Sequence, residues 1–260
     1  MRMMKSNKSC AYPMISALLT MATVWSLGMA AAVPAPADFW VRDQPGRITH
    51  ACTGTEPLVI CLQGRKVVMQ VQSDRTNGFS YTARFFNVLR EVEKEKVLFV
   101  VGRELNPDVR VNDQPLKSEF PSAVTFDGLL TLTYPAAEGV VVTRTVYPSR
   151  ARALVVEEWQ VRNTTGERVA VTVAPIRKVT PVGENVAIVW SCSGVEAASV
   201  KAGGVLSFST CVQARLAAEP DLAVNVAAER GARRALAEAA WSGPGRLETP
   251  EPAQIGRAHV

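Results

Sequence analysis

Residues 144–175 read RTVYPSRARALVVEEWQVRNTTGERVAVTVAP, and this stretch decides the fold. Two runs within it, 153–161 and 168–173, are rich in valine, and in the second run valine recurs at every second position. That period of two is typical of a half-buried β-strand. Asn163, Thr164 and Gly166 lie between the runs, and asparagine and glycine favour the backbone angles of turns. The stretch therefore predicts two antiparallel strands joined as a β-hairpin.

Short runs of the same kind recur on both sides of this stretch. Turn residues separate them, and the pair Glu138-Gly139 predicts a second hairpin around residue 139. Many short strands at close intervals indicate an all-β antiparallel sandwich, which we place at residues 33–220. The further strands are expected at residues 67–71, 97–101, 109–111, 130–134, 140–146, 186–192 and 205–212.

The composition changes after the last of these strands. Residues 222–241 are rich in alanine, glutamate and arginine, with apolar residues spaced as in a helix. We expect a linker helix with its connection at residues 221–246, weakened at Gly231 and ended by Gly243-Pro244-Gly245. Arg230, Arg233 and Arg234 are expected to form a solvated face of this helix.

The N-terminus has the pattern of a secretory signal peptide, expected at residues 1–32. Arg2, Lys5 and Lys8 precede a mostly apolar stretch at residues 11–29, and three alanines follow before Pro34. The alternative is an uncleaved membrane anchor, but such a span usually needs roughly 20 apolar residues. We therefore expect an exported protein, periplasmic or extracellular, with no membrane span after cleavage.

The other end of the chain has a different origin on our interpretation. Residues 254–260 read QIGRAHV, which resembles the in-frame translation of a common sequencing-library adapter, CAG-ATC-GGA-AGA-GCA-CAC-GTC. Such a segment belongs outside an argument about the fold. We expect genuine sequence to end near Ala253, so that the chain is a fragment of a longer protein.

The two end segments account for most of the positive charge. Four of the 29 Lys and Arg residues lie in them (Arg2, Lys5, Lys8 and Arg257), which leaves 25 against 24 Asp and Glu. The remaining chain is therefore close to neutral. It has no basic stripe with interleaved aromatic residues, so we expect no nucleic-acid partner.

Cysteines give the sequence its clearest covalent hypothesis. Cys10 lies in the signal segment, and an exported protein can oxidise the other four. We favour the pairings Cys52–Cys61 and Cys192–Cys211, and four buried thiols are the alternative. Because the chain has no Cys-x-x-Cys and only His50 as a nearby imidazole, we expect no metal site and no cofactor.

Two segments resemble the N-terminal part of six-hairpin glycosidases. The first is 144–175, with Tyr147-Pro148-Ser149 before the strand, Glu158-Trp159 within it and Asn163-Thr164 at the turn. The second is Leu-Glu-Thr-Pro-Glu-Pro at 247–252, which is similar to an L-x-T-P-D-P run but has Glu251 in place of Asp. The resemblance implies a galactose-mutarotase-like super-sandwich, and residues 247–253 would begin a missing (α/α)6 barrel.

The resemblance also implies where the chemistry would be. In such enzymes two carboxylates on the barrel cleave the glycosidic bond. Both would follow the last residue of this chain, so we expect no catalytic residue here. Glu157 and Glu158 cannot jointly flank one bond because adjacent strand residues face opposite sides. The chain is thus expected to be the non-catalytic sandwich of an exported glycoside hydrolase acting on oligo- or polysaccharide. Carbohydrate would be bound through the barrel.

Two other classes of protein fit parts of the sequence. A free-standing carbohydrate-binding or adhesion sandwich would need an aromatic platform, for which Trp40 and Trp190 are candidates. Trp159 is expected in the core, and Trp241 between the helix and the sandwich. A polysaccharide lyase ranks last, because in that class the helical domain usually precedes the sandwich. His50 is expected to be structural rather than catalytic.

Overall fold

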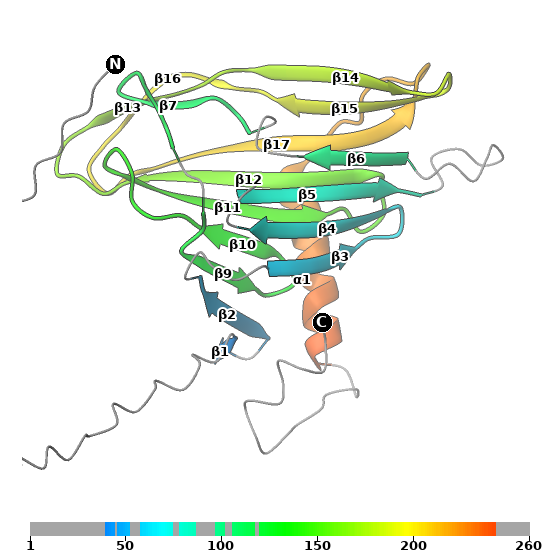
Figure 1. The fold of residues 1–260 in the computed structure, drawn as a ribbon, viewed down its shortest axis with the longest axis horizontal. Coiled ribbons are helices and arrows are strands. Elements are labelled where there is room, and N and C mark those ends of the chain that lie inside the picture. Colours follow the sequence, from blue (N-terminus) through cyan, green and yellow to red (C-terminus); the bar gives the residue numbers. More distant parts are fainter. Residues whose placement is uncertain are drawn as a thin grey trace, which may run out of the picture. The chain divides into compact units, whose positions relative to one another are not determined.

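The computed structural model describes residues 40–44, 46–52, 58–74, 78–86, 97–101, 106–117 and 120–242 (Figure 1). The predictions for residues 1–32 and 243–260 lie outside these residues. The described part belongs to one compact unit. It consists of strands and a single described α-helix, which confirms the all-β antiparallel sandwich followed by a helix.

Nine strands form the largest sheet, in which every pair of neighbours is antiparallel. Figure 1 shows them stacked from β1 at one edge to β14 at the other. In spatial order they are β1 (Val41–Gln44), β2 (Arg47–Ala51), β9 (Ala123–Phe126), β10 (Leu130–Thr133), β11 (Val140–Pro148), β12 (Leu154–Asn163), β17 (Val205–Leu216), β15 (Val186–Cys192) and β14 (Ile176–Val182).

Two four-stranded sheets share one hydrophobic core with the inner face of the large sheet. This core is built mainly from valine and aromatic side chains, whose branched and planar shapes fit a pleated surface. The first sheet contains β3 (Leu58–Gln63), β4 (Val67–Asp74), β5 (Gly78–Phe85) and β6 (Val97–Val101). The second contains β16 (Val195–Val200), β13 (Val169–Val173), β7 (Val109–Val111) and β8 (Gln114–Pro115).

The hairpin predicted within residues 144–175 is wrong. Its two strands form as β12 and β13, but β12 pairs with β11 and β17, whereas β13 pairs with β7 and β16. The reason lies in Asn163, whose side chain is fully buried and donates to the carbonyls of Glu167 (2.6 Å) and Val200 (3.0 Å). These bonds hold the chain as it crosses from the large sheet to a small one.

The second predicted hairpin is confirmed. Ala137 and Val140 pair across the turn, and Glu138 and Gly139 both adopt the left-handed region, with φ of 49° and 75°. Two residues with positive φ match the right-handed twist of the flanking strands. The other expected strands also form, with ends that differ by a few residues.

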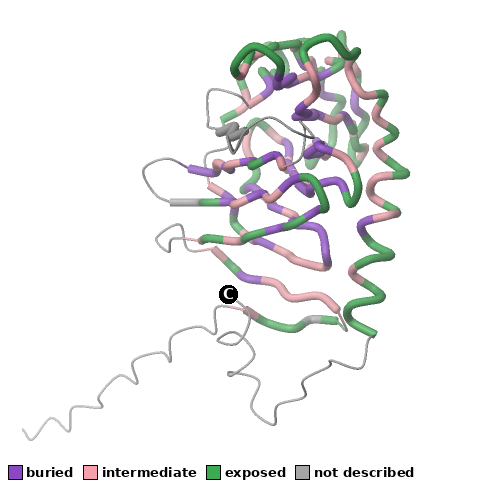
Figure 2. The backbone as a smooth tube through the Cα atoms, turned by 90° about the vertical axis from the view of Figure 1, so that its right-hand side faces the viewer, coloured by how far each residue is buried: buried purple, intermediate pink, exposed green. Residues whose placement is uncertain are grey.

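The helix α1 (Val226–Ser242) begins later than the sequence predicts. Asn225 caps it, because its side-chain oxygen accepts from the backbone N–H of Ala228 at 3.0 Å. Residues 222–225 belong to neither a helix nor a strand, and the helix continues through Gly231 without a break. Figure 2 shows α1 along one side of the strands, with much of its length exposed. No helix in the described part of the chain has the length and apolarity needed to cross a membrane.

Candidate functional site

The strand β12 places two neighbouring acids on opposite faces of the large sheet. Glu157 points to the inner face, where it contacts Tyr81 of β5 and Arg144 of β11. Glu158 points to the outer face, where it contacts Tyr147 and the helix residue Arg230. This confirms that the two carboxylates do not share a site.

On the inner face, Glu157 forms a buried ion pair with Arg144. The guanidinium Nε and Nη2 lie 2.8 Å and 2.6 Å from Oε2 of Glu157, and the two residues are 1% and 2% exposed. The Tyr81 hydroxyl donates to Oε1 of Glu157 at 2.6 Å. Arg144 Nη1 also donates to the side chain of Asn106 at 3.1 Å. The pair therefore joins the large sheet to the sheet that contains β5.

Aromatic rings enclose this ion pair. The guanidinium carbon of Arg144 lies 4.2 Å from the Phe79 ring centre and 4.6 Å from that of Trp159. Burial alone would lower the pKa of Arg144, but the carboxylate of Glu157 and the Tyr134 side chain raise it above its ordinary value. Burial, and then the negative charge of Glu157, raise the pKa of Tyr81. The pair is thus a charged structural link, closed to solvent.

The outer face has a small apolar floor under the start of the helix. Leu129, Tyr147, Leu154, Val156 and Cys211 form it. Val224 and Val226 pack against this cluster from the linker and the first turn of α1. So few apolar side chains bury little area, and polar contacts must supply much of the specificity of the attachment.

Glu158 anchors the first half of the helix. Its carboxylate accepts from Nε of Arg230 at 2.8 Å and from a second guanidinium nitrogen, and the Tyr147 hydroxyl donates to it at 2.6 Å. Burial, followed by the Glu158 hydrogen bond, raises the pKa of Tyr147, so this hydroxyl stays a donor. The Arg230 side chain is 43% exposed, which leaves this ion pair partly in solvent.

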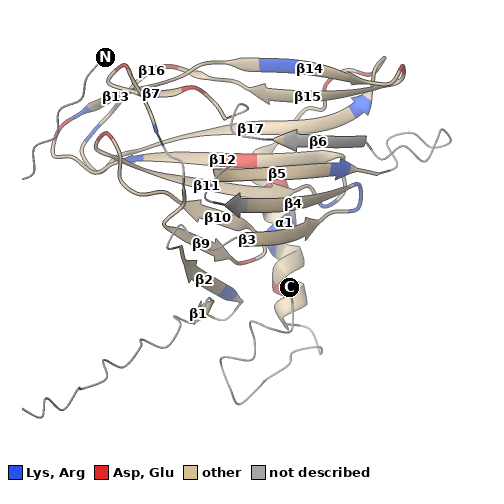
Figure 3. Cartoon of the chain, viewed as in Figure 1, with Lys and Arg blue, Asp and Glu red and all other residues tan. Residues whose placement is uncertain are grey.

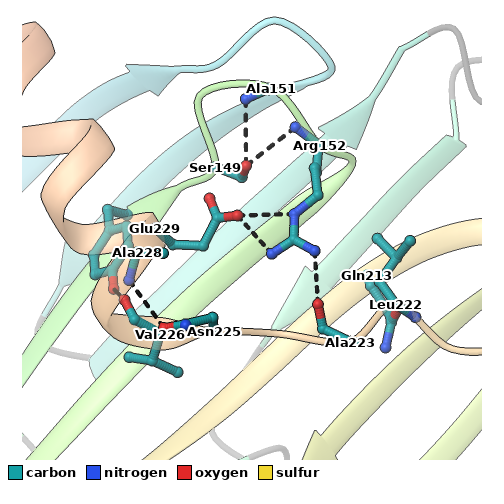
Figure 4. Close-up of polar contacts among 11 residues, drawn as sticks. Ser149, Ala151, Arg152, Gln213, Leu222, Ala223, Asn225, Val226, Ala228 and Glu229 are labelled. Carbon is teal, nitrogen blue, oxygen red and sulfur yellow. Dashed lines mark hydrogen bonds and ion pairs between the residues drawn. The ribbon is translucent and has the colours of Figure 1, made fainter.

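A second ion pair reaches the helix from the turn between β11 and β12 (Figure 4). Arg152 donates to the Glu229 carboxylate at 2.8 Å and to the Ala223 carbonyl at 2.7 Å. Ser149 Oγ accepts from the backbone N–H of Arg152 at 3.1 Å and holds that turn in place. Arg152 therefore binds both the helix and the linker that precedes it.

The linker itself is bonded to the sheet. The backbone N–H of Leu222 donates to the Gln213 side chain at 2.6 Å, and Gln213 is 2% exposed. Asp221 accepts from Arg215 at 2.9 Å and from Arg177 at 3.0 Å. Burial alone would raise the pKa of Asp221, but these hydrogen bonds lower it. These hydrogen bonds attach the segment between β17 and α1 to the large sheet.

Arg233 connects the helix to two sheets at once. Its Nε donates to the carbonyl of Gly128, in the turn between β9 and β10, at 3.0 Å. Its Nη1 donates to the carbonyl of Gln63, at the end of β3, at 2.6 Å. Burial lowers the pKa of this guanidinium. The predicted solvated face is therefore wrong for Arg233, because backbone carbonyls solvate its charge in place of water.

The tryptophans divide between core and surface. Trp159 is buried and stacks on Phe208 with ring centres 5.9 Å apart, which confirms its place in the core. Trp190 is only 4% exposed, so its proposed role as a sugar platform is wrong. Trp40 is half-buried, 5.5 Å from the ring of buried His50. Trp241 is 46% exposed and lies beside Gly46 in the turn between β1 and β2.

The positions of the cysteines do not agree with the predicted disulfides. Cys61, Cys192 and Cys211 hold thiols, so neither predicted disulfide is formed. Cys192 pairs with Thr210, and Ser191 pairs with Cys211, across β15 and β17. Since paired residues share a face and adjacent residues do not, Cys192 and Cys211 lie on opposite faces of the sheet. A bond between them would require the sheet to open. No group of three or more metal-ligating residues occurs in the described part of the chain.

Comparison with known protein families gives no match, and comparison with curated protein sequences gives none either. Among solved structures, the chain is similar to one described as "Putative kojibiose phosphorylase from human microbiome". The sequence identity is 9% and the TM-score is 0.39. The similarity covers 83% of this chain and 37% of that one, so this chain spans little more than a third of that protein's length.

Proposed function

We propose that this chain is the non-catalytic β-sandwich of an exported glycoside hydrolase that acts on oligo- or polysaccharide. In this role the outer face of the large sheet holds α1 in one orientation, and α1 leads to a helical domain that carries the catalytic carboxylates. The resemblance of residues 144–175 and 247–252 to six-hairpin glycosidases supports the class of enzyme. The signal pattern at residues 1–32 supports export.

One observation carries this proposal. Arg152, Glu158 and Arg233 attach the helix to the turn between β11 and β12, to the sheet face and to the ends of two sheets. A surface helix that needed only to cover apolar side chains would not need three separate polar attachments, because apolar burial has no direction. Directional bonds set an orientation, as the connection to a second domain requires.

A free-standing carbohydrate-binding sandwich has less support. Its two candidate platform residues are Trp190, which lies in the core, and Trp40, whose ring lies tilted against the ring of His50. Sugar rings bind to accessible aromatic faces, and the buried Trp190 offers none.

The test begins with the complete gene. We expect sequence after residue 253 to encode a helical domain with paired acidic residues, and the complete protein to hydrolyse a glycoside. Residues 33–253 alone should hydrolyse none of the same substrates. A complete gene without such a domain would refute the proposal, as would hydrolysis by the isolated sandwich.

A further inference from the structure

Two turns from different sheets meet at one end of the sandwich. The backbone N–H of Arg65, between β3 and β4, donates to the carbonyl of Arg150, between β11 and β12, at 3.0 Å. The approach is closest at Gly64, where an added Cβ would lie 2.0 Å from the Ser149 carbonyl oxygen. Only glycine permits this contact. The backbone therefore brings two arginines together in spite of their charge.

Two more cations lie beside them. Val68 pairs with Arg84 across β4 and β5, and the backbone N–H of Phe86 donates to the Lys66 carbonyl at 2.8 Å. Paired residues share a face of the sheet, and Lys66 is two positions before Val68. The side chains of Lys66 and Arg84 therefore point to the same side. We name Arg65, Lys66, Arg84 and Arg150 the basic patch. All four are exposed, and Figure 3 shows blue segments at this end of β4 and β5.

Three acids near the helix are already paired. Glu229 binds Arg152, Glu158 binds Arg230, and Asp127 lies 3.8 Å from Arg234. Within the described ranges, no ion pair joins a member of the basic patch to an acid. Among the residues that the structure describes, this cluster is therefore a local excess of positive charge. Like charges held together repel, and an anionic ligand would relieve that repulsion.

We propose that the basic patch binds an acidic polysaccharide through its carboxylate groups. Arginine suits this ligand, because its planar fork matches the two oxygens of a carboxylate. Single exposed contacts are weak, but a chain-like polyanion can meet cations on three elements at once. The choice of a polysaccharide over other polyanions rests on the proposed function. The patch would hold the exported enzyme on a charged glycan, whatever bond its catalytic domain cleaves.

Binding of the present chain to polygalacturonate, with dextran as the uncharged comparison, tests this proposal without any hydrolysis. We expect binding to polygalacturonate alone, weakening as NaCl rises from about 50 to about 200 mM. The double variant Arg65→Gln/Arg84→Gln should bind roughly fivefold more weakly. The matched control is Arg162→Gln/Arg168→Gln, which removes the same charge from exposed positions elsewhere and should bind like the parent.

Three results would overturn the proposal. They are equal losses in the two double variants, binding of dextran as strong as that of polygalacturonate, and tighter binding of single-stranded DNA or of phosphatidylglycerol vesicles. We expect each variant to fold, since all four substituted side chains are exposed. Circular dichroism checks this. Failure here would leave the proposed glycosidase role intact, because hydrolysis by the complete protein is measured separately.

Discussion

Glu157 and Glu158 differ by one position in the chain and occupy contrasting environments. Glu157 faces a closed core, where Arg144 and Tyr81 satisfy it and aromatic rings exclude water. Glu158 faces a helix across a small apolar floor, and its partner Arg230 is 43% exposed. The Glu157 carboxylate thus neutralises a fully buried charge. The Glu158 carboxylate makes only one of several polar contacts between the sheet and the helix. The inner face should determine global stability, and the outer face the attachment of the helix.

The largest effect is expected at Glu157. Glu157→Gln removes the negative charge and leaves Arg144 buried without a counter-ion, which should lower the free energy of unfolding by about 3–5 kcal/mol. Urea denaturation measures this change. The double variant Arg144→Met/Glu157→Leu should lose less than the single variant, because it buries no unpaired charge. A single variant that loses no more than Glu158→Gln would contradict the contrast between the faces.

The next effect belongs to Arg233 on the outer side. Arg233→Met removes the donors to the carbonyls of Gly128 and Gln63. This loss should lower the free energy of unfolding by about 1–3 kcal/mol. Amide hydrogen exchange should show faster opening of α1 than of β12. Arg234→Met is the matched control on the same helix, since that side chain is 55% exposed, and it should change stability by less than about 0.5 kcal/mol. Similar results for the two variants would show that Arg233 does not hold the helix on the sheets.

A smaller effect is expected at Glu158. Glu158→Gln should cost less than about 1 kcal/mol, because its ion pair with Arg230 is partly in solvent and the amide can still accept from Tyr147. The difference between this variant and the parent should shrink at high salt. Chemical denaturation at two salt concentrations measures it. A salt-independent loss as large as that of Glu157→Gln would show that the outer face is as closed as the inner one.

The smallest effect at neutral pH concerns the outer-face thiol. Burial, and then the charge of Glu157, raise the pKa of Cys211 to about 12. Its stabilising contribution is therefore complete below the ordinary thiol pKa of 9.0 and is lost as the pH rises toward 12. At pH 8, iodoacetamide should modify exposed Cys61 quickly and Cys211 only when the chain opens. Equal rates for the two thiols would show that the helix does not cover this face.

Local patterns in the sequence were sufficient for several features. Short β-rich runs located nine of the seventeen described strands. Alternation also separated Glu157 from Glu158, because neighbouring residues of a strand point to opposite faces. Composition located the helix, and the Glu138-Gly139 turn predicted its hairpin. Each of these depends on residues close together in the chain, where backbone geometry alone decides the outcome.

Tertiary structure decided the rest, because it depends on residues far apart in the chain. Strands β12 and β13 look like a hairpin, yet Asn163 bonds to the carbonyl of Val200 and directs them into different sheets. Arg233 looks like a solvated helix residue, yet it meets a carbonyl that is 170 positions away. Alternation along a strand says which residues share a face, but only the assembled sheets show what that face contacts.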